Sequence, residues 1–181
     1  DMEIYKGIID PVFAKHDIPL FFDNRRSIDT HPLMVFVISL IDIIRNNFNS
    51  DHIFRYLKTG ILDINIEDIS LLENYVMRWD IKGFNAWKIL WDFHPDGFGK
   101  EMTDNDKATL DKIEQIKSIF LTPIIELENN LTDKNTGKDF VLFIYNFLCG
   151  VDIQNRIDNL CFALTQNGEI ELADEYARMW E

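Results

Sequence analysis

The strongest constraint on the fold is an apolar helical stretch that begins at Pro32. From there, apolar residues recur every three or four positions, which is the period of an α-helix. The stripe consists of Leu33, Phe36, Val37, Leu40, Ile41, Ile44 and Phe48. Further apolar residues lie off the stripe, at Met34, Val35, Ile38 and Ile43. We therefore expect a helix that is buried on more than one side, with the other helices packed around it.

The residues before this helix predict a capped helix start and a short strand. Thr30 or His31 is placed to cap the helix, and Pro32 then occupies the first helical position, where its missing N–H is harmless. Residues 18–22 predict a strand, because Pro19 favours an extended backbone before it and aliphatic and aromatic residues follow. Residues 4–15 predict a further helix. The chain opens without an initiator methionine, and we expect it to be an excised fragment.

The rest of the chain predicts a succession of helices, most of them with a polar N-cap. Ser50 is expected to cap 51–58, Asn65 with Asp68 to cap 66–79, Thr103 to cap 104–131, and Thr136 with Asp139 to cap the next helix; 152–165 and 169–180 follow. Pro123 should kink the long helix 104–131. Residues 80–102 predict an ordered loop pinned by aromatic residues, with one short helix near 86–90. The fold class expected from these patterns is mainly α.

Charge divides the chain unequally. The formal net charge is −13, but residues 1–60 hold seven Lys and Arg against eight Asp and Glu, leaving eleven against 23 for the remainder. A strongly acidic surface repels phosphate backbones, so any contact with nucleic acid should come from the first third. Two basic pairs with aromatic neighbours lie there, Arg25 with Arg26 and Arg55 with Lys58. They could grip a DNA backbone, but from the residues alone a solvated turn and the outer face of a short helix are favoured.

Several site chemistries find little support in the sequence. Gly137-Lys138 and Lys58-Thr59-Gly60 lack the glycines that a phosphate loop requires. Residues 92–96 (Asp-Phe-His-Pro-Asp) hold three possible metal ligands, but without a second cluster a turn with a solvated His94 is favoured. Cys149 and Cys161 lie on helical stripes and are expected to be reduced core thiols. The apolar run 33–44 is shorter than the roughly 20 residues that cross a bilayer, so we expect a soluble, cytoplasmic protein.

Three strings in the chain resemble a known family. Ile18–Leu33, which reads IPLFFDNRRSIDTHPL, is similar to AddB, the B subunit of the bacterial AddAB (RexAB-type) ATP-dependent helicase/deoxyribonuclease. So are the string 54–60 (FRYLKTG), followed by 72–75 (LENY), and the closing string 168–176 (GEIELADEY) with Trp180. The resemblance runs nearly end to end and implies an internal fragment of a much larger chain.

The resemblance implies a fold and a role. AddB is built like a UvrD-type helicase without its motor, so residues 1–30 would be a helix and strand of a truncated RecA-like (2A-type) domain. Residues 31–181 would be the helical 2B-like insertion. The parent complex is an ATP-dependent helicase and exonuclease that processes double-strand DNA ends for repair and recombination. Its iron–sulfur cluster and magnesium site lie outside this chain, for which no cofactor is expected.

Two functions remain open at this point. One is a non-catalytic, DNA-end-handling module that meets double-stranded ends or the emerging single strand, with Arg25, Arg26, Arg55 and Lys58 as contacts. The other is a helical docking module that contacts only protein, such as the rest of AddB or the AddA-type subunit. Because a strand at 18–22 would lack its sheet neighbours, we also expect the fragment to self-associate.

Overall fold

A computed structural model describes residues 5–19, 31–99, 101–131 and 135–178. All regular secondary structure in these ranges is helical, which confirms a mainly α protein. The helices are α1 (Lys6–Lys15), α2 (Pro32–Arg45), α3 (Ser50–Leu57), α4 (Ile66–Arg78), α5 (Phe84–Lys88), α6 (Asp104–Asn130), α7 (Gly137–Gly150), α8 (Ile153–Gln166) and α9 (Ile170–Arg178). No helix among the described residues has the length and apolar character needed to cross a membrane.

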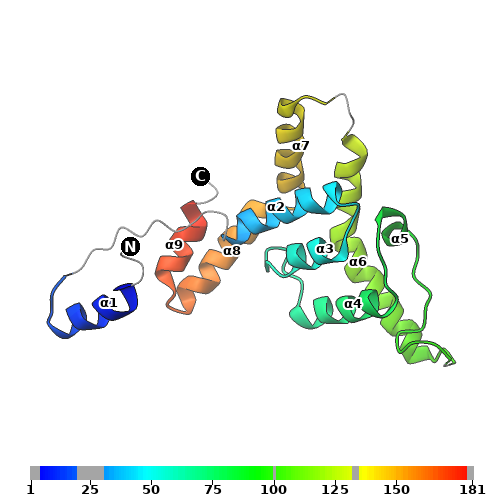
Figure 1. Ribbon diagram of the computed structural model, residues 1–181, viewed down its shortest axis with the longest axis horizontal. Coiled ribbons are helices and arrows are strands. Elements are labelled where there is room, and N and C mark those ends of the chain that lie inside the picture. Colours follow the sequence, from blue (N-terminus) through cyan, green and yellow to red (C-terminus); the bar gives the residue numbers. More distant parts are fainter. Residues whose placement is uncertain (1–4, 20–30, 100, 132–134, 179–181) are drawn as a thin grey trace.

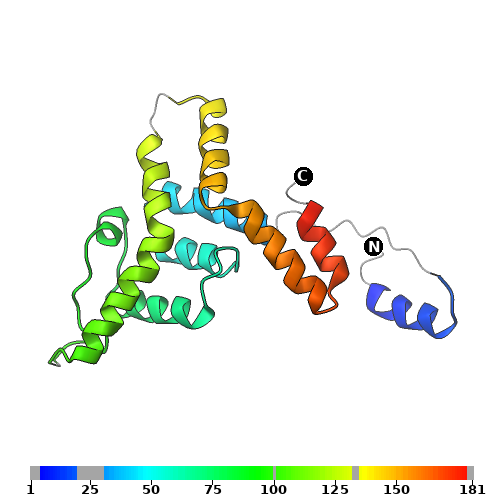
Figure 2. The ribbon, with the colours of Figure 1, turned by 180° about the vertical axis from the view of Figure 1, so that it is seen from behind.

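The helices form a lobe with an arm. In Figure 1 the lobe contains α2 to α7, and α8 and α9 lead away from it as an antiparallel pair. Figure 2 shows the same arrangement from behind, with α1 at the far end of the arm, apart from the lobe in both views. The longest helix, α6, contacts both α4 and α7. The lobe is therefore the part of the chain where helices from distant segments meet.

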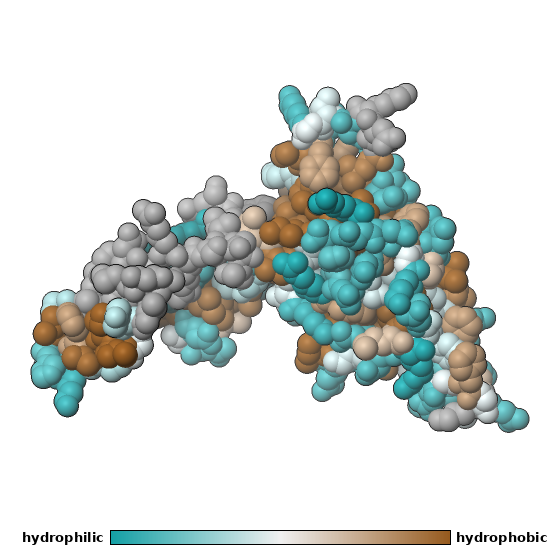
Figure 3. Space-filling model, viewed as in Figure 1, coloured by the Kyte–Doolittle hydropathy of each residue, from teal (hydrophilic) through white to brown (hydrophobic). Residues whose placement is uncertain are grey.

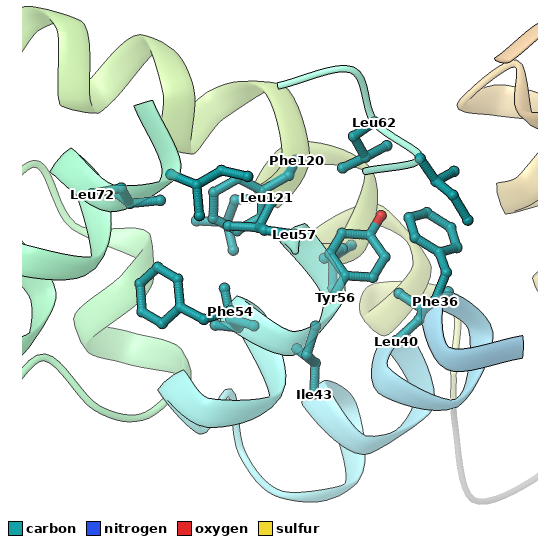
Figure 4. Packing of buried hydrophobic residues seen from close by; sticks show 14 of the residues in the cluster. Phe36, Leu40, Ile43, Phe54, Tyr56, Leu57, Leu62, Leu72, Phe120 and Leu121 are labelled. Atoms are coloured by element: carbon teal, nitrogen blue, oxygen red, sulfur yellow. The ribbon is translucent and has the colours of Figure 1, made fainter. Parts of the chain in front are cut away.

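The predicted apolar helix lies at the centre of this lobe. Phe36, Leu40 and Ile43 of α2 are fully buried, and no residue from 31 to 44 is exposed. Figure 4 shows these side chains meeting Tyr56 and other residues of α3, with α4 and α6 closing the cluster. The rings of Phe36 and Tyr56 stack with their centroids 4.2 Å apart. The prediction of a helix buried on more than one side is confirmed.

Polar caps begin most of the long helices as predicted. His31 caps α2 by accepting a hydrogen bond from the Leu33 N–H through its Nδ1 atom, at 3.2 Å. Thr103 and Thr136 each form a reciprocal capping box, with Asp106 and Asp139 respectively. These bonds satisfy N–H groups that a helix start otherwise leaves unpaired, so the sequence chemistry determines where α2, α6 and α7 begin.

Two predicted caps need correction. The α3 cap is Asn49, whose Oδ1 accepts from the Asp51 N–H at 2.8 Å, whereas Ser50 is the first helical residue and its hydroxyl donates to the Ile81 carbonyl. Asn49 and Ser50 are both good cap residues, and the second role of the serine depends on a segment 31 residues away. Asn65 does cap α4, but it accepts from the Glu67 N–H rather than forming the predicted box with Asp68.

The aromatic loop contains its short helix two residues earlier than predicted. That helix, α5, begins after Gly83, whose φ of 84° places it in the left-handed region, and it ends where Ile89 becomes extended.

Pro123 lies inside α6, which runs unbroken to Asn130; its predicted kink stays a prediction. In the predicted strand 18–22, Ile18 and Pro19 lie in no regular element and the remaining residues are outside the described ranges. The boundary expected near residue 30 falls in the same gap.

Candidate nucleic-acid interface

The candidate DNA contacts that the structure describes are on α3. This helix buries Ile53, Phe54, Tyr56 and Leu57, so Arg55 and Lys58 are left on its outer side. The buried residues follow the helical period and pack against α2 and α4, which fixes the direction in which the two cations point. Arg25 and Arg26 lie outside the described residues.

Arg55 and Lys58 line a shallow hollow on the surface. The hollow has a volume of about 270 Å³, and its lining also includes Ser50, Asp51, Phe54, Glu73 and Met77. It therefore brings two cations together with two carboxylates and an apolar floor. Such a mixture differs from the continuous basic groove that tracks a nucleic-acid backbone.

Each of the two cations already faces an acidic side chain. Lys58 Nζ lies 2.7 Å from Glu73 Oε1, and Arg55 Nη1 lies 3.9 Å from Asp42 Oδ2. His52 faces the same oxygen of Asp42, also at 3.9 Å. Ion pairs that are this exposed contribute only about 0–1 kcal/mol, so a phosphate could displace them cheaply. The local charge is nevertheless close to balanced, which weakens any attraction for DNA.

The possible metal site at residues 92–96 is a locked turn. Ligand atoms of His94, Asp96 and Asp106 lie within 4.8 Å of one another. However, His94 Nδ1 accepts the Asp96 N–H at 3.0 Å, which leaves the ring proton on Nε2, 3.4 Å from Asp106 Oδ2. That oxygen also accepts from the Thr103 N–H at 2.9 Å. A cation would have to displace this proton and break the α6 cap, so the predicted turn is the better description.

The expectation that His94 is solvated is wrong. Its side chain is only 9% exposed, because the loop folds back over the start of α6. Three further side chains, from α4 and its C-cap, hold the same loop. The Tyr75 hydroxyl donates to the Phe93 carbonyl, Trp79 Nε1 to the His94 carbonyl and Arg78 to the Pro95 carbonyl. The predicted ordered, aromatic-pinned loop is thereby confirmed.

A buried lysine that the sequence did not reveal fixes the other side of this loop. Lys117 Nζ donates to the Ile89 carbonyl at 2.8 Å and to Glu114 Oε1 at 2.6 Å, and it lies 4.2 Å from the centre of the Trp91 ring. The same Glu114 oxygen accepts from the Trp91 N–H. Burial lowers the pKa of Lys117, and the hydrogen bond and negative charge of Glu114 act in the opposite direction. In the sequence this pair looks like any helical i, i+3 ion pair, since nothing there shows that the loop covers it.

The two cysteines are free, but one prediction about them is wrong. Cys149 is exposed, because α7 packs against α6 through its opposite side, where Ile144 and Phe147 are buried. Cys161 is half-buried, and its thiol lies 3.4 Å from the Ala173 carbonyl of α9. Burial raises the pKa of Cys161. Neither thiol is placed beside a base that would activate it within the described residues.

Comparison with known proteins identifies relatives along the whole chain. The B subunit of the ATP-dependent helicase/deoxyribonuclease of Clostridium botulinum (strain Loch Maree / Type A3) is 38% identical over 182 residues, 99% of this chain. The proteins of the same name from Thermoanaerobacter sp. (strain X514) and Clostridium kluyveri (strain NBRC 12016) are 35% and 32% identical, each over all of this chain. No family model matches.

The match covers only part of each relative. This chain spans 16% of the length of the three proteins just named. The similarity extends across the described lobe and arm alike, since it omits at most 1% of the chain. The resemblance to AddB is confirmed: this chain is homologous, from end to end, to one segment of the B subunits of ATP-dependent helicase/deoxyribonucleases.

Proposed function

We propose that this chain is a non-catalytic structural and DNA-end-handling module of an AddAB-type helicase–nuclease. The observation that carries the proposal is the similarity to helicase/deoxyribonuclease B subunits over the whole chain. The parent complex would act in double-strand break repair and recombination in the cytoplasm, together with an AddA-type subunit. ATP hydrolysis, the nuclease site and the iron–sulfur cluster would belong to other parts of that complex.

We also propose a division of the chain, which rests on the resemblance to the layout of AddB. Residues 31–181 would be the helical 2B-like domain, and residues 1–30 would be a helix and strand of a RecA-like domain. The separation of α1 from the lobe supports such a division, because the core of the lobe begins only at Leu33. The lobe would then act as a spacer that holds other surfaces of the complex in place.

A docking module that never contacts DNA is the second candidate. The observation that favours it is the pairing of the described basic residues: Lys58 with Glu73, and Arg55 with Asp42. The excess of Asp and Glu after residue 60 favours it as well. The two candidates differ in one measurable property, the affinity of this surface for DNA.

DNA binding tests the choice between the two candidates. If the basic residues contact DNA, the affinity should be weak and indifferent to sequence, and the logarithmic salt slope no steeper than about −4 for four neutralised phosphates. Fluorescence anisotropy with a labelled forked duplex measures both quantities. Reversing Arg25 and Arg26 to Glu should abolish binding, and reversing Arg55 and Lys58 should weaken it.

The matched control reverses Lys134 and Lys138 to Glu, which changes the net charge equally. Equal loss from the control and from the test pairs would favour the docking module.

Activity assays test the non-catalytic part of the proposal. The purified chain with Mg²⁺ and ATP should hydrolyse neither ATP nor DNA, since its sequence has neither a phosphate loop nor a nuclease motif. Turnover that copurifies with the chain would contradict the assignment.

A further inference from the structure

The helix α7 is unusually apolar around its whole circumference. From Phe140 to Val151 the sequence reads FVLFIYNFLCGV and contains no charged residue. A helix of this kind is normally covered by protein or lipid on every side. Its 14 residues span about 21 Å, well below the roughly 30 Å of a bilayer core, so a transmembrane position is excluded.

Among the described residues, one side of α7 is covered and the other is exposed. Ile144 and Phe147 are buried toward the lobe. On the other side Val141, Leu142 and Tyr145 are 67%, 52% and 56% exposed, and Cys149 is exposed too. Val141, Tyr145 and Cys149 follow one another at intervals of four residues, so they form a line along the helix. We call these four residues the α7 face; Figure 3 shows apolar side chains gathered over α7.

A groove between α6 and α7 lies on another side of α7, and none of the four face residues lines it. It has a volume of about 360 Å³ and is lined by Pro123, Glu126, Leu127, Asn130, Phe143, Asn146, Phe147 and Gly150. At its Gly150 end a Cβ atom would meet nothing within 4 Å, so this end is open. Single exposed apolar residues are ordinary on protein surfaces. A continuous uncharged helix face is instead typical of an interaction surface.

We propose that the α7 face is an interface with the rest of an AddB-type polypeptide, covered by an apolar surface outside residues 1–181. The relatives are about six times longer than the matched segment, which spans 16% of them, so ample chain is available to cover it. This inference rests on the proposed place of the chain in an AddB-type polypeptide. It does not depend on whether the module contacts DNA.

The small size of the face favours a tethered partner over a second copy. Four side chains on one helix expose far less than the roughly 800 Å² per partner of a standard interface between separate proteins. Separate molecules also lose translational and rotational freedom when they associate. A surface on the same polypeptide is present at an effective concentration that is high without any additional contact, so a small apolar face is sufficient.

Cys149 provides a reporter inside the face. Its alkylation by N-ethylmaleimide, followed by peptide mass spectrometry, can be compared between the 181-residue chain and the full-length polypeptide. In the full-length polypeptide we expect Cys149 to react at least about tenfold more slowly, because the covered thiolate is inaccessible. Cys161, whose thiol contacts the Ala173 carbonyl, should react slowly in both. Denatured samples should react alike and so control for the thiol itself.

A charge placed in the face tests the same interface without relying on the thiol. Val141→Glu should leave the thermal unfolding of the 181-residue chain unchanged, but it should restore Cys149 alkylation in the full-length polypeptide. The matched control is Ile119→Glu, an apolar position on α6 that is 55% exposed, which should restore nothing.

Equal Cys149 reactivity in the two proteins would overturn the proposal. Protection that appears in the 181-residue chain as its concentration rises would also overturn it, by assigning the face to a second copy. Both results are independent of the ATPase, nuclease and DNA-binding assays. A failure of this inference is therefore distinguishable from a failure of the proposed function.

Discussion

The lobe and the arm differ in how deeply they bury their side chains. In the lobe, large residues from different helices are completely enclosed, among them Phe36, Tyr56, Trp87 and Phe120. Among the described residues of the arm few side chains are buried; on α8 these are Ile153 and Ile157, where the helix leaves the lobe. Farther along, Ala173 and Tyr176 are the buried residues of α9. The lobe has its own core, whereas the arm depends on a few contacts with its base.

Those contacts join the arm to the lobe at two places. Arg156 of α8 donates to the Leu62 carbonyl, in the connection between α3 and α4, at 2.6 Å. Tyr176 of α9 packs against His31, the cap of α2, with ring centroids 4.6 Å apart. The apolar area that joins the arm to the lobe comes mainly from Ile153, Ile157 and Tyr176, and the charge-assisted bond and the ring contact add to it. Global stability should therefore depend on the lobe, and the arm should open locally at lower cost.

Truncating a phenylalanine in each region should give the largest contrast. Phe120 of α6 is fully buried, and Phe162 of α8 is 67% exposed. Phe120→Ala should lower the free energy of unfolding by about 3–5 kcal/mol, since it removes buried apolar area and leaves a cavity. Phe162→Ala should change it by less than about 0.5 kcal/mol. Urea unfolding followed by far-ultraviolet circular dichroism measures both, and similar losses would mean that the arm shares the core.

Alkaline pH should destabilise the lobe through its buried tyrosines. Burial raises the pKa of Tyr75 to about 12, and it raises the pKa of Tyr56 as well. Above pH 10 the unfolded chain releases these protons and the folded chain retains them, so unfolding becomes more favourable as the pH rises. For Tyr75 alone the loss should approach about 1.4 kcal/mol per pH unit between pH 10 and 12.

The variant Tyr75→Phe isolates this contribution. Its stability should fall less steeply above pH 10 than that of the parent chain, although it lacks the bond from the Tyr75 hydroxyl to the Phe93 carbonyl at every pH. Tyr5→Phe is the control, because this tyrosine is 56% exposed at the start of α1. Unfolding free energies at pH 8, 10 and 11 supply the slopes. An unchanged slope in Tyr75→Phe would show that other groups cause the alkaline loss.

Apolar periodicity and cap chemistry predicted the lobe well because both are local properties of the chain. Phe36, Leu40 and Phe48 of the predicted stripe are fully buried, although Ile43, predicted off the stripe, is fully buried too. Thr103 and Thr136 cap their helices as expected. The exposure of Cys149 was not predictable in this way. A helix that is apolar all round does not indicate which of its sides has a partner, and that choice depends on residues far away in the sequence.

The candidate site was less predictable for the same reason. Arg55 and Lys58 do lie on the outer side of α3, as its periodicity indicated. Their acidic partners come from elsewhere, Asp42 from α2 and Glu73 from α4. Lys117 likewise reaches the Ile89 carbonyl, 28 residues away. Charge counted along the sequence cannot show such pairings, which depend on the packing of the helices.

The two capping boxes allow a finer comparison, since the same chemistry begins α6 and α7. Thr103→Ala should lower global stability by about 1 kcal/mol, because α6 is part of the core and its first N–H groups lose their acceptor. Thr136→Ala should affect global stability less and instead speed hydrogen exchange in the first turn of α7. Exchange measured by mass spectrometry distinguishes these outcomes. Equal global losses would show that α7 unfolds together with the lobe.

Removal of residues 1–29 should have the smallest effect on stability. The core of the lobe begins at Leu33, and α1 lies apart from it, with Tyr5, Ile8 and Val12 exposed. The predicted strand 18–22 would also lack its sheet neighbours, so exchange or edge pairing of the whole N-terminal segment with a second copy is favoured. We therefore expect the intact chain to self-associate as its concentration rises, and the truncated chain to remain folded and monomeric.

Sedimentation velocity over a hundredfold range of concentration, with thermal unfolding of both chains, measures the two properties. Tyr5→Ser with Ile8→Ser in the intact chain should reduce association in the same way. If the intact chain is monomeric throughout, or the truncated chain unfolds, then the N-terminal segment is part of the helical domain and the proposed boundary near residue 30 is wrong.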